Sequence, residues 1–131
     1  MMLPPFKNLG EVDHKRILDE IVLGDGTKHQ RLEDIDAPYT NEMMTKYGMY
    51  NSRIMALRCK ECYSWHRDTT PRVHFPLITN NNCLFISEET AFSMPVGSAY
   101  WVDTRKHHTA LNGNRGDYIR YHIVGMTNET F

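Results

Sequence analysis

The sequence predicts an all-β core of the double-stranded β-helix type, a jelly roll or cupin-like fold, preceded by one or two short helices. Two observations favour this fold. Beyond residue 51, short apolar runs recur with turn signals between them, which is typical of a β-sandwich or barrel. Within several runs apolar and polar residues alternate, as expected of strands with one buried face. The expected strands lie at 53–58, 62–66, 72–78, 83–87, 91–94, 98–103, 108–112 and 118–124.

The chain before this core is expected to be partly helical. Residues 1–11 are expected to be irregular because they contain two prolines and a glycine. An amphipathic helix is predicted over 13–23, where Asp13 can cap the start, Gly24 ends the run and apolar residues recur at helical spacing. We expect this helix to brace one sheet. A second short helix is predicted from Thr40 to Lys46.

Length and composition suit a single domain of ordinary globular character. The 131 residues are 40% hydrophobic and 24% charged, which fits one modest core. We therefore expect one domain over 1–131, with a brace at 1–50 and the jelly-roll core at 51–125. The formal net charge of −1 argues against a nucleic-acid binder, which would need a clear basic excess.

Cysteine usage and the absence of long apolar runs predict a cytoplasmic protein. No signal peptide is expected at the start, and no apolar run is long enough to span a bilayer. Three cysteines are too few for a disulfide framework. Cys59 and Cys62 form a lone CxxC, which as half of a zinc site would need two further ligands. Ordinary hairpin cysteines are therefore favoured over a zinc or a redox site.

Residues with the chemistry of ligands recur at i, i+2 spacing. Side chains two apart on an extended strand point to the same face. Any one such pair is most simply a solvent face, but solvent faces are usually rich in Lys, Glu, Ser and Thr. Three pairs of ligand-type residues favour instead the mouth of a barrel around a ligand. The pairs are His66 with Asp68, Arg72 with His74, and Arg120 with His122.

The first of these pairs predicts a metal site. His66 and Asp68 can converge on one point, and His108, far downstream, could supply a third ligand. A metal ion held by two histidines and one carboxylate keeps other coordination positions open. This arrangement suits non-haem Fe(II) oxygen chemistry.

Six motifs follow one another over more than half of the chain. They are His66-Arg67-Asp68, Arg72-Val73-His74-Phe75-Pro76-Leu77-Ile78-Thr79-Asn80, Met94-Pro95-Val96-Gly97, Tyr100-Trp101-Val102-Asp103, His108-Thr109-Ala110-Leu111-Asn112 and Arg120-Tyr121-His122-Ile123-Val124. In this order, residues 50 to 124 resemble the aspartyl/asparaginyl β-hydroxylase family. That family includes free-proline hydroxylases and is part of the 2-oxoglutarate-dependent Fe(II) dioxygenases.

The resemblance implies a jelly-roll fold with iron held by His66, Asp68 and His108. Some β-hydroxylases of the family lack the carboxylate ligand, and Asp68 places this chain with the members that keep it. His108 is preferred to His107 because only that register matches the rest of the distal motif, which includes Asn112.

The resemblance also implies the cosubstrates, 2-oxoglutarate and dioxygen. Arg120 would pair with the far carboxylate of 2-oxoglutarate, while Arg72 and His74 would lie near its keto-acid end. An inward Arg120 requires an anionic ligand on physical grounds too, because a buried guanidinium without a carboxylate partner costs several kcal/mol.

The expected activity is therefore Fe(II)- and 2-oxoglutarate-dependent hydroxylation of an amino acid, or of an Asp/Asn/Pro-type side chain in a peptide or protein. One alternative is a cupin-like metal protein with non-oxidative chemistry, and another is a degenerate jelly-roll binding module. The paired arginines argue against the first, and the intact set of metal ligands argues against the second. The sequence leaves the substrate and the oligomeric state open.

Overall fold

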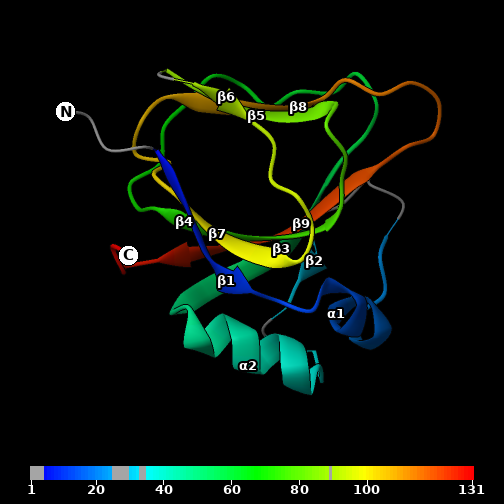
Figure 1. The fold of residues 1–131 in the computed structure, drawn as a ribbon, viewed down its shortest axis with the longest axis vertical. Coiled ribbons are helices and arrows are strands. Elements are labelled where there is room, and N and C mark those ends of the chain that lie inside the picture. Colours follow the sequence, from blue (N-terminus) through cyan, green and yellow to red (C-terminus); the bar gives the residue numbers. More distant parts are fainter. Residues whose placement is uncertain (1–4, 25–29, 33–34, 89) are drawn as a thin grey trace.

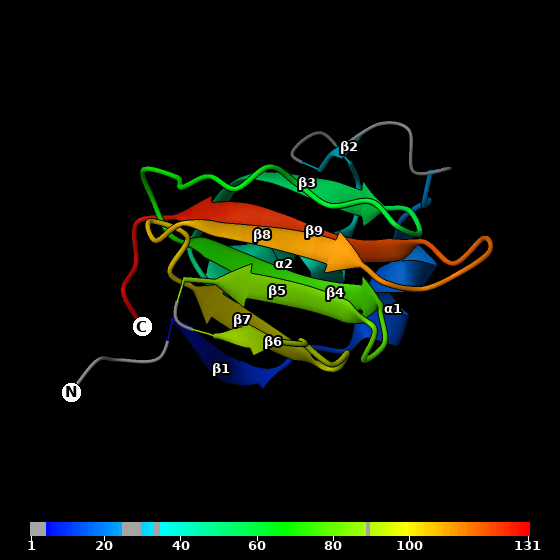
Figure 2. The ribbon, with the colours of Figure 1, turned by 90° about the horizontal axis from the view of Figure 1, so that it is seen from above.

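The computed structural model describes residues 5–24, 30–32, 35–88 and 90–131. Two antiparallel sheets face each other, and Figure 2 shows the smaller sheet lying over the larger one. This arrangement confirms the predicted jelly-roll fold. The larger sheet has the strand order β1-β7-β4-β9-β3-β2 and the smaller one β6-β5-β8. The strands of the larger sheet are β1 (Phe6–Glu11), β2 (Gln30–Arg31), β3 (Met49–Leu57), β4 (Arg72–Ile78), β7 (Ser98–Val102) and β9 (Arg120–Thr127); those of the smaller are β5 (Cys83–Ser87), β6 (Ala91–Phe92) and β8 (His108–Asn112).

Helices α1 (His14–Glu20) and α2 (Pro38–Lys46) cover the outer face of the larger sheet (Figure 1). The larger apolar core lies between these helices and the sheet, and Val73, Phe75 and Ile123 are almost completely buried in it. Successive side chains of a strand point to opposite faces. The alternate positions of β4 and β9 therefore point toward the smaller sheet, and two of the three ligand-type pairs lie at these positions, Arg72 with His74 and Arg120 with His122.

The start of the chain differs from the prediction. Residues 6–11 form β1, which pairs antiparallel with β7, so the expectation of an irregular segment is wrong there. The prolines that suggested irregularity lie before the strand. Gly10, with φ of 130°, coincides with a register shift in the pairing, which is a conformation that glycine readily adopts.

Both predicted helices are present, with shifted ends. The Asp13 carboxylate accepts a hydrogen bond from the backbone N–H of Arg16 at 3.2 Å, so the predicted cap is confirmed. The helix ends at Glu20, earlier than expected, and the chain leaves it in an extended conformation at Ile21. Val22 therefore does not join the apolar face and is 81% exposed. None of the helices that the structure describes is long and apolar enough to cross a lipid bilayer.

The segment between β3 and β4 runs along β8 but is not a regular strand. The strand predicted at 62–66 is replaced by two isolated bridges, one between Cys62 and Leu111 and one between His66 and His108. Asn112, the last residue of β8, adds to this attachment because its side-chain amide donates to the carbonyls of Leu57 at 2.9 Å and Tyr118 at 3.0 Å. The segment is therefore held along β8 by contacts at both ends of that strand.

Candidate metal centre

A pocket of about 610 Å³, including its open mouth, lies between the two sheets. All six residues that the sequence analysis assigned to the site line this pocket. They are His66, Asp68, Arg72, His74, His108 and Arg120. The rest of the lining was not predicted from the sequence, because it consists of ordinary apolar, aromatic and hydroxyl side chains that carry no signal of a ligand. These residues are Met55, Tyr63, Phe85, Thr104, Ala110 and Val124.

Two imidazoles and one carboxylate converge at this pocket. Their ligand atoms lie within 4.8 Å of one another in His66, Asp68 and His108. Oδ1 of Asp68 is 3.7 Å from Nε2 of His66, and its Oδ2 is 3.6 Å from Nε2 of His108. The His66 side chain is 39% exposed and that of His108 only 7% exposed, so the cluster extends from the mouth of the pocket into its interior.

Backbone carbonyls orient both imidazoles. Nδ1 of His66 lies 2.6 Å from the carbonyl oxygen of Ser64, and Nδ1 of His108 lies 2.8 Å from that of Lys106. Because a carbonyl only accepts, each Nδ1 carries the proton and each Nε2 keeps a lone pair. Both free Nε2 atoms are thus turned toward Asp68, in the form that a metal ion requires.

Strand pairing explains why residues far apart in sequence meet here. His66 and His108 exchange two backbone hydrogen bonds, of 3.1 and 2.8 Å. The backbone N–H of Asp68 donates to the carbonyl of Thr104 at 2.8 Å. The His-x-Asp segment is therefore held antiparallel to the chain that enters β8, and the three side chains are placed by backbone geometry.

His107, the alternative distal ligand, points elsewhere. Its ring stacks on Trp65 at a centroid distance of 6.2 Å, and its Nδ1 is 3.7 Å from Oε2 of Glu88. The structure thus brings His108, and not His107, to His66 and Asp68.

Arg72 lies against the carboxylate of this cluster. Its Nη2 is 3.6 Å from Oδ1 of Asp68, and its Nη1 donates to the hydroxyl of Thr70 at 2.6 Å and to the Thr70 carbonyl at 2.9 Å. Arg72 therefore links the carboxylate to the loop that precedes β4 and adds positive charge at the pocket wall.

Arg120 is a buried cation with incomplete hydrogen bonding. Its side chain is on β9, it is 4% exposed, and neither its Nε nor its Nη1 has a hydrogen-bond partner among the described residues. Burial lowers the pKa of this guanidinium, although not enough to discharge an arginine. Unpaired donors on a buried cation fit a site built for an anion.

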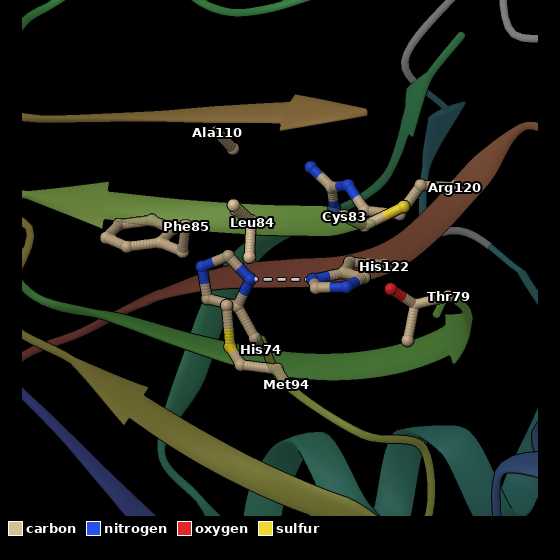
Figure 3. A pocket seen from close by; sticks show the side chains of 9 residues that line it. All are labelled: His74, Thr79, Cys83, Leu84, Phe85, Met94, Ala110, Arg120 and His122. Carbon is tan, nitrogen blue, oxygen red and sulfur yellow. Dashed lines mark hydrogen bonds between the residues drawn. The ribbon is translucent and has the colours of Figure 1, made fainter. Parts of the chain in front are cut away.

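Two buried histidines lie beside Arg120, as Figure 3 shows. Nδ1 of His74 is 3.0 Å from Nδ1 of His122. Burial, and after it the positive charge of Arg120, lowers the pKa of His74 to about 3 and that of His122 well below its ordinary value. Both rings are therefore neutral near pH 7. In the sequence, His122 stands out through its spacing from Arg120, but no role in the site was predicted for it.

The positions of the three cysteines bear on the zinc site and the redox site that were considered for them. Cys59 donates to the carbonyl of Tyr118 at 2.9 Å, Cys62 is exposed and Cys83 is buried. Across residues 5–24, 30–32, 35–88 and 90–131, the cluster at Asp68 is the sole group with the spacing of a metal site. The cysteines are therefore free thiols in this structure.

The match to known proteins covers nearly the whole chain. Residues 11–127 match the family described as aspartyl/asparaginyl beta-hydroxylase. The chain belongs to this family. As a member of the aspartyl/asparaginyl β-hydroxylase family it is an enzyme of the hydroxylase kind, and its cluster of two histidines and an aspartate is suited to a metal.

Solved structures resemble the chain at low sequence identity. A non-heme monooxygenase, described as the ThoJ-Ni complex, is 13% identical with a TM-score of 0.55, over 94% of this chain and 74% of its own. A cupin-2 domain containing protein from Shewanella frigidimarina is 10% identical with a TM-score of 0.41, over 66% of this chain and 91% of its own. At such identities the likeness to the monooxygenase concerns the fold alone. No curated protein matches the sequence.

Proposed function

We propose that the protein is an Fe(II)- and 2-oxoglutarate-dependent dioxygenase that hydroxylates an amino acid, or an Asp/Asn/Pro-type side chain in a peptide or protein. The observation that carries this proposal is the content of one pocket. This pocket is lined by two imidazoles and one carboxylate, which are the donor set for non-haem Fe(II). It is also lined by a buried arginine that has unpaired hydrogen-bond donors.

His66, Asp68 and His108 would hold the metal ion. The two neutral imidazoles and one carboxylate would use three coordination positions and leave the others for a keto acid and dioxygen. When bound, Fe(II) and 2-oxoglutarate together would activate dioxygen for insertion into a C–H bond. The contribution of the chain is to fix the ligands before the metal arrives, through the carbonyls of Ser64 and Lys106.

Arg120, Arg72 and His74 would bind 2-oxoglutarate. Arg120 supplies unpaired N–H donors deep in the pocket, which suits the far carboxylate. Arg72 lies beside Asp68, close to where the keto-acid end would meet the metal. His74 offers one more polar group on the same wall.

Apolar side chains would keep bulk water from the reacting centre. Phe85 lies stacked on the ring of His108, with centroids 5.1 Å apart and planes inclined by 15°. Met55 and Val124 line the same pocket. A dry wall strengthens the electrostatic interactions inside and limits side reactions.

The proposal is tested by an anaerobic titration of the metal-free protein with Fe(II) and then with 2-oxoglutarate. The expected result is the weak visible charge-transfer absorption of a keto acid chelated to Fe(II). It should disappear in His66→Ala and in His108→Ala. The matched control is His107→Ala, which removes the neighbouring imidazole that stacks on Trp65 and should leave the absorption in place.

The other outcomes identify the alternatives. Iron binding without the absorption would reject 2-oxoglutarate and favour a cupin-like metal protein with non-oxidative chemistry. Failure to bind iron at all would favour a jelly-roll binding module. Loss of the absorption in His107→Ala but not in His108→Ala would show that the distal ligand is assigned to the wrong histidine.

A further inference from the structure

His74 and His122 form a pair whose protons are interdependent. Their Nδ1 atoms are 3.0 Å apart, the two rings are perpendicular, and the residues are 6% and 3% exposed. A neutral imidazole carries one N–H, so one Nδ1 must donate and the other must accept. The two rings therefore have opposite tautomers. If His122 donates, His74 carries its own proton on Nε2; if His74 donates, its Nε2 is a bare lone pair.

The surroundings of His122 favour it as the donor. Its Nε2 is buried and has no hydrogen-bond partner among the described residues. The cavity drawn in Figure 3 is shared by His122, the hydroxyl of Thr79 and the guanidinium of Arg120, and none of the described residues that line it carries a carboxylate. The positive charge of Arg120 favours a lone pair on Nε2 of His122 over an N–H. His122 then keeps its proton on Nδ1, where His74 accepts it.

The surroundings of His74 require the complementary form. Figure 3 shows its second ring nitrogen on the side of Phe85, away from His122. His74 lines the metal pocket, whereas His122 does not. Arg72 and Arg120 line that pocket as well and make it suitable for an anion. A histidine that faces an anion must present an N–H, because a lone pair would be repelled.

We propose that His122 is a positioning residue that acts through His74. It donates its Nδ1 proton to Nδ1 of His74 and so holds His74 in the tautomer that offers an Nε2–H to a carboxylate of 2-oxoglutarate. The identity of that anion rests on the proposed function, but the assignment of the two tautomers does not.

The tautomers can be read directly by NMR of metal-free protein labelled with ¹⁵N-histidine. Long-range ¹H–¹⁵N spectra distinguish a protonated ring nitrogen from one with a lone pair, and a coupling across the Nδ1–H···Nδ1 hydrogen bond identifies the pair. The spectrum of His122→Asn shows which ring of the pair is His122. We expect His74 protonated on Nε2 and His122 protonated on Nδ1. The reverse assignment, or the absence of the coupling, would overturn the proposal.

Two matched variants test the consequence for binding. In His122→Asn the side-chain amide can still donate to Nδ1 of His74, whereas in His122→Leu nothing can. The binding constant of 2-oxoglutarate is measured by calorimetry on protein loaded with Zn(II) in place of iron. We expect His122→Leu to weaken binding by about tenfold or more, the effect of a lost hydrogen bond to a charged acceptor, and His122→Asn to recover most of it.

The results separate this proposal from the proposed function. If the wild type shows the expected tautomers and does not bind 2-oxoglutarate, the proposed function fails and the tautomer assignment stands. If the wild type binds 2-oxoglutarate and both variants bind equally well, the positioning role of His122 is wrong.

Discussion

At the scale of single residues, Arg120 is the clearest sign that the pocket is built for a ligand. The burial of an ion is costly unless it is paired and hydrogen-bonded, and two nitrogens of Arg120 have no partner among the described residues. A protein that keeps such a residue is less stable without its ligand than it would be with an apolar side chain there. An anion that pairs with Arg120 should therefore stabilise the native state.

The Arg120→Met variant should separate the fold from binding. Replacing a buried, partly unpaired cation by an apolar side chain of similar length should raise the free energy of unfolding by about 1–3 kcal/mol. If 2-oxoglutarate binds as proposed, it should raise the melting temperature of the metal-loaded wild type, and this increase should be lost in the variant. Both are measured by thermal and urea unfolding. The control is Arg105→Met, whose guanidinium is 48% exposed and pairs with Asp103 at the surface, so little change is expected. A variant that is less stable and still responds to 2-oxoglutarate would contradict the assignment.

At the scale of elements, contacts with neighbouring strands and helices determine local structure where the sequence signal for a strand or a helix cap is weak. Residues 6–11 carry no strong strand signal and become a strand because the edge of β7 offers hydrogen-bond partners. Helix α2 begins at Pro38, and its N-cap residue Ala37 supplies no side-chain hydrogen bond. The carboxylate of Glu20, the last residue of α1, accepts hydrogen bonds from the backbone N–H groups of Tyr39 and Thr40 at 2.9 and 2.8 Å. One helix thus caps the next.

The Glu20→Ala variant should measure this cap. Removal of a side-chain cap from a helix costs about 1 kcal/mol, so we expect a loss of that size in urea unfolding at pH 7. Burial raises the pKa of Glu20, but the hydrogen bonds from Tyr39 and Thr40 outweigh it and leave the pKa lowered. A carboxyl with a lowered pKa stabilises the fold above its ordinary pKa, and this contribution disappears as the pH falls. The difference between variant and wild type should therefore shrink in acid.

The control for this cap is in the same helix. Asp19 is exposed and precedes Glu20 directly, so Asp19→Ala should change the free energy of unfolding by less than about 0.5 kcal/mol. Equal losses in the two variants would show that the effect comes from helix propensity or surface charge rather than from the cap.

At the scale of the whole molecule, the space between the sheets holds an apolar cluster and a group of polar side chains. The apolar cluster includes Leu57, Tyr100 and Val102. The polar group comprises the candidate metal ligands, two arginines and the neutral pair of His74 and His122. The larger apolar core lies on the other face of the larger sheet, under the helices. The helices therefore supply much of the hydrophobic stabilisation, which leaves the polar residues between the sheets available for binding.

Buried neutral histidines should make the metal-free protein sensitive to acid. The pKa of His74 is lowered to about 3, so the unfolded chain takes up a proton at this residue below about pH 6.5 while the folded chain does not. Stability is therefore lost as the pH falls. Between pH 7 and pH 5, His74 alone should reduce the free energy of unfolding by about 2 kcal/mol, and His122 acts in the same direction.

Urea unfolding of the metal-free protein at the two pH values checks this expectation. His74→Asn lacks the titrating group and should lose less stability between pH 7 and pH 5 than the wild type does, by about 2 kcal/mol. If wild type and variant lose the same amount, His74 is already protonated in the folded protein, and the neutral pair does not exist.

The sequence alone was sufficient for the class of the fold and for the identity of the metal-site candidates, and the physical reason is local. The alternation of polar and apolar residues along β4 and β9 determines which side chains face the helices and which face the smaller sheet. The spacing of His66 and Asp68 is equally local, whereas His108 was chosen over His107 because the chain resembles a family with that distal motif. The structure brings these three residues together.

Tertiary structure decided the hydrogen bonds and the burial of the site residues, because these depend on atoms of other strands and loops. The hydrogen bonds that free Nε2 of His66 and His108 come from the backbone path of the segments that carry them. The pairing of His74 with His122 joins residues 48 positions apart, and no periodicity within either strand reveals it. The same holds for the unpaired donors of Arg120 and for the apolar wall of the pocket. Burial and hydrogen bonding are properties of the packed molecule, because each depends on atoms that other strands contribute.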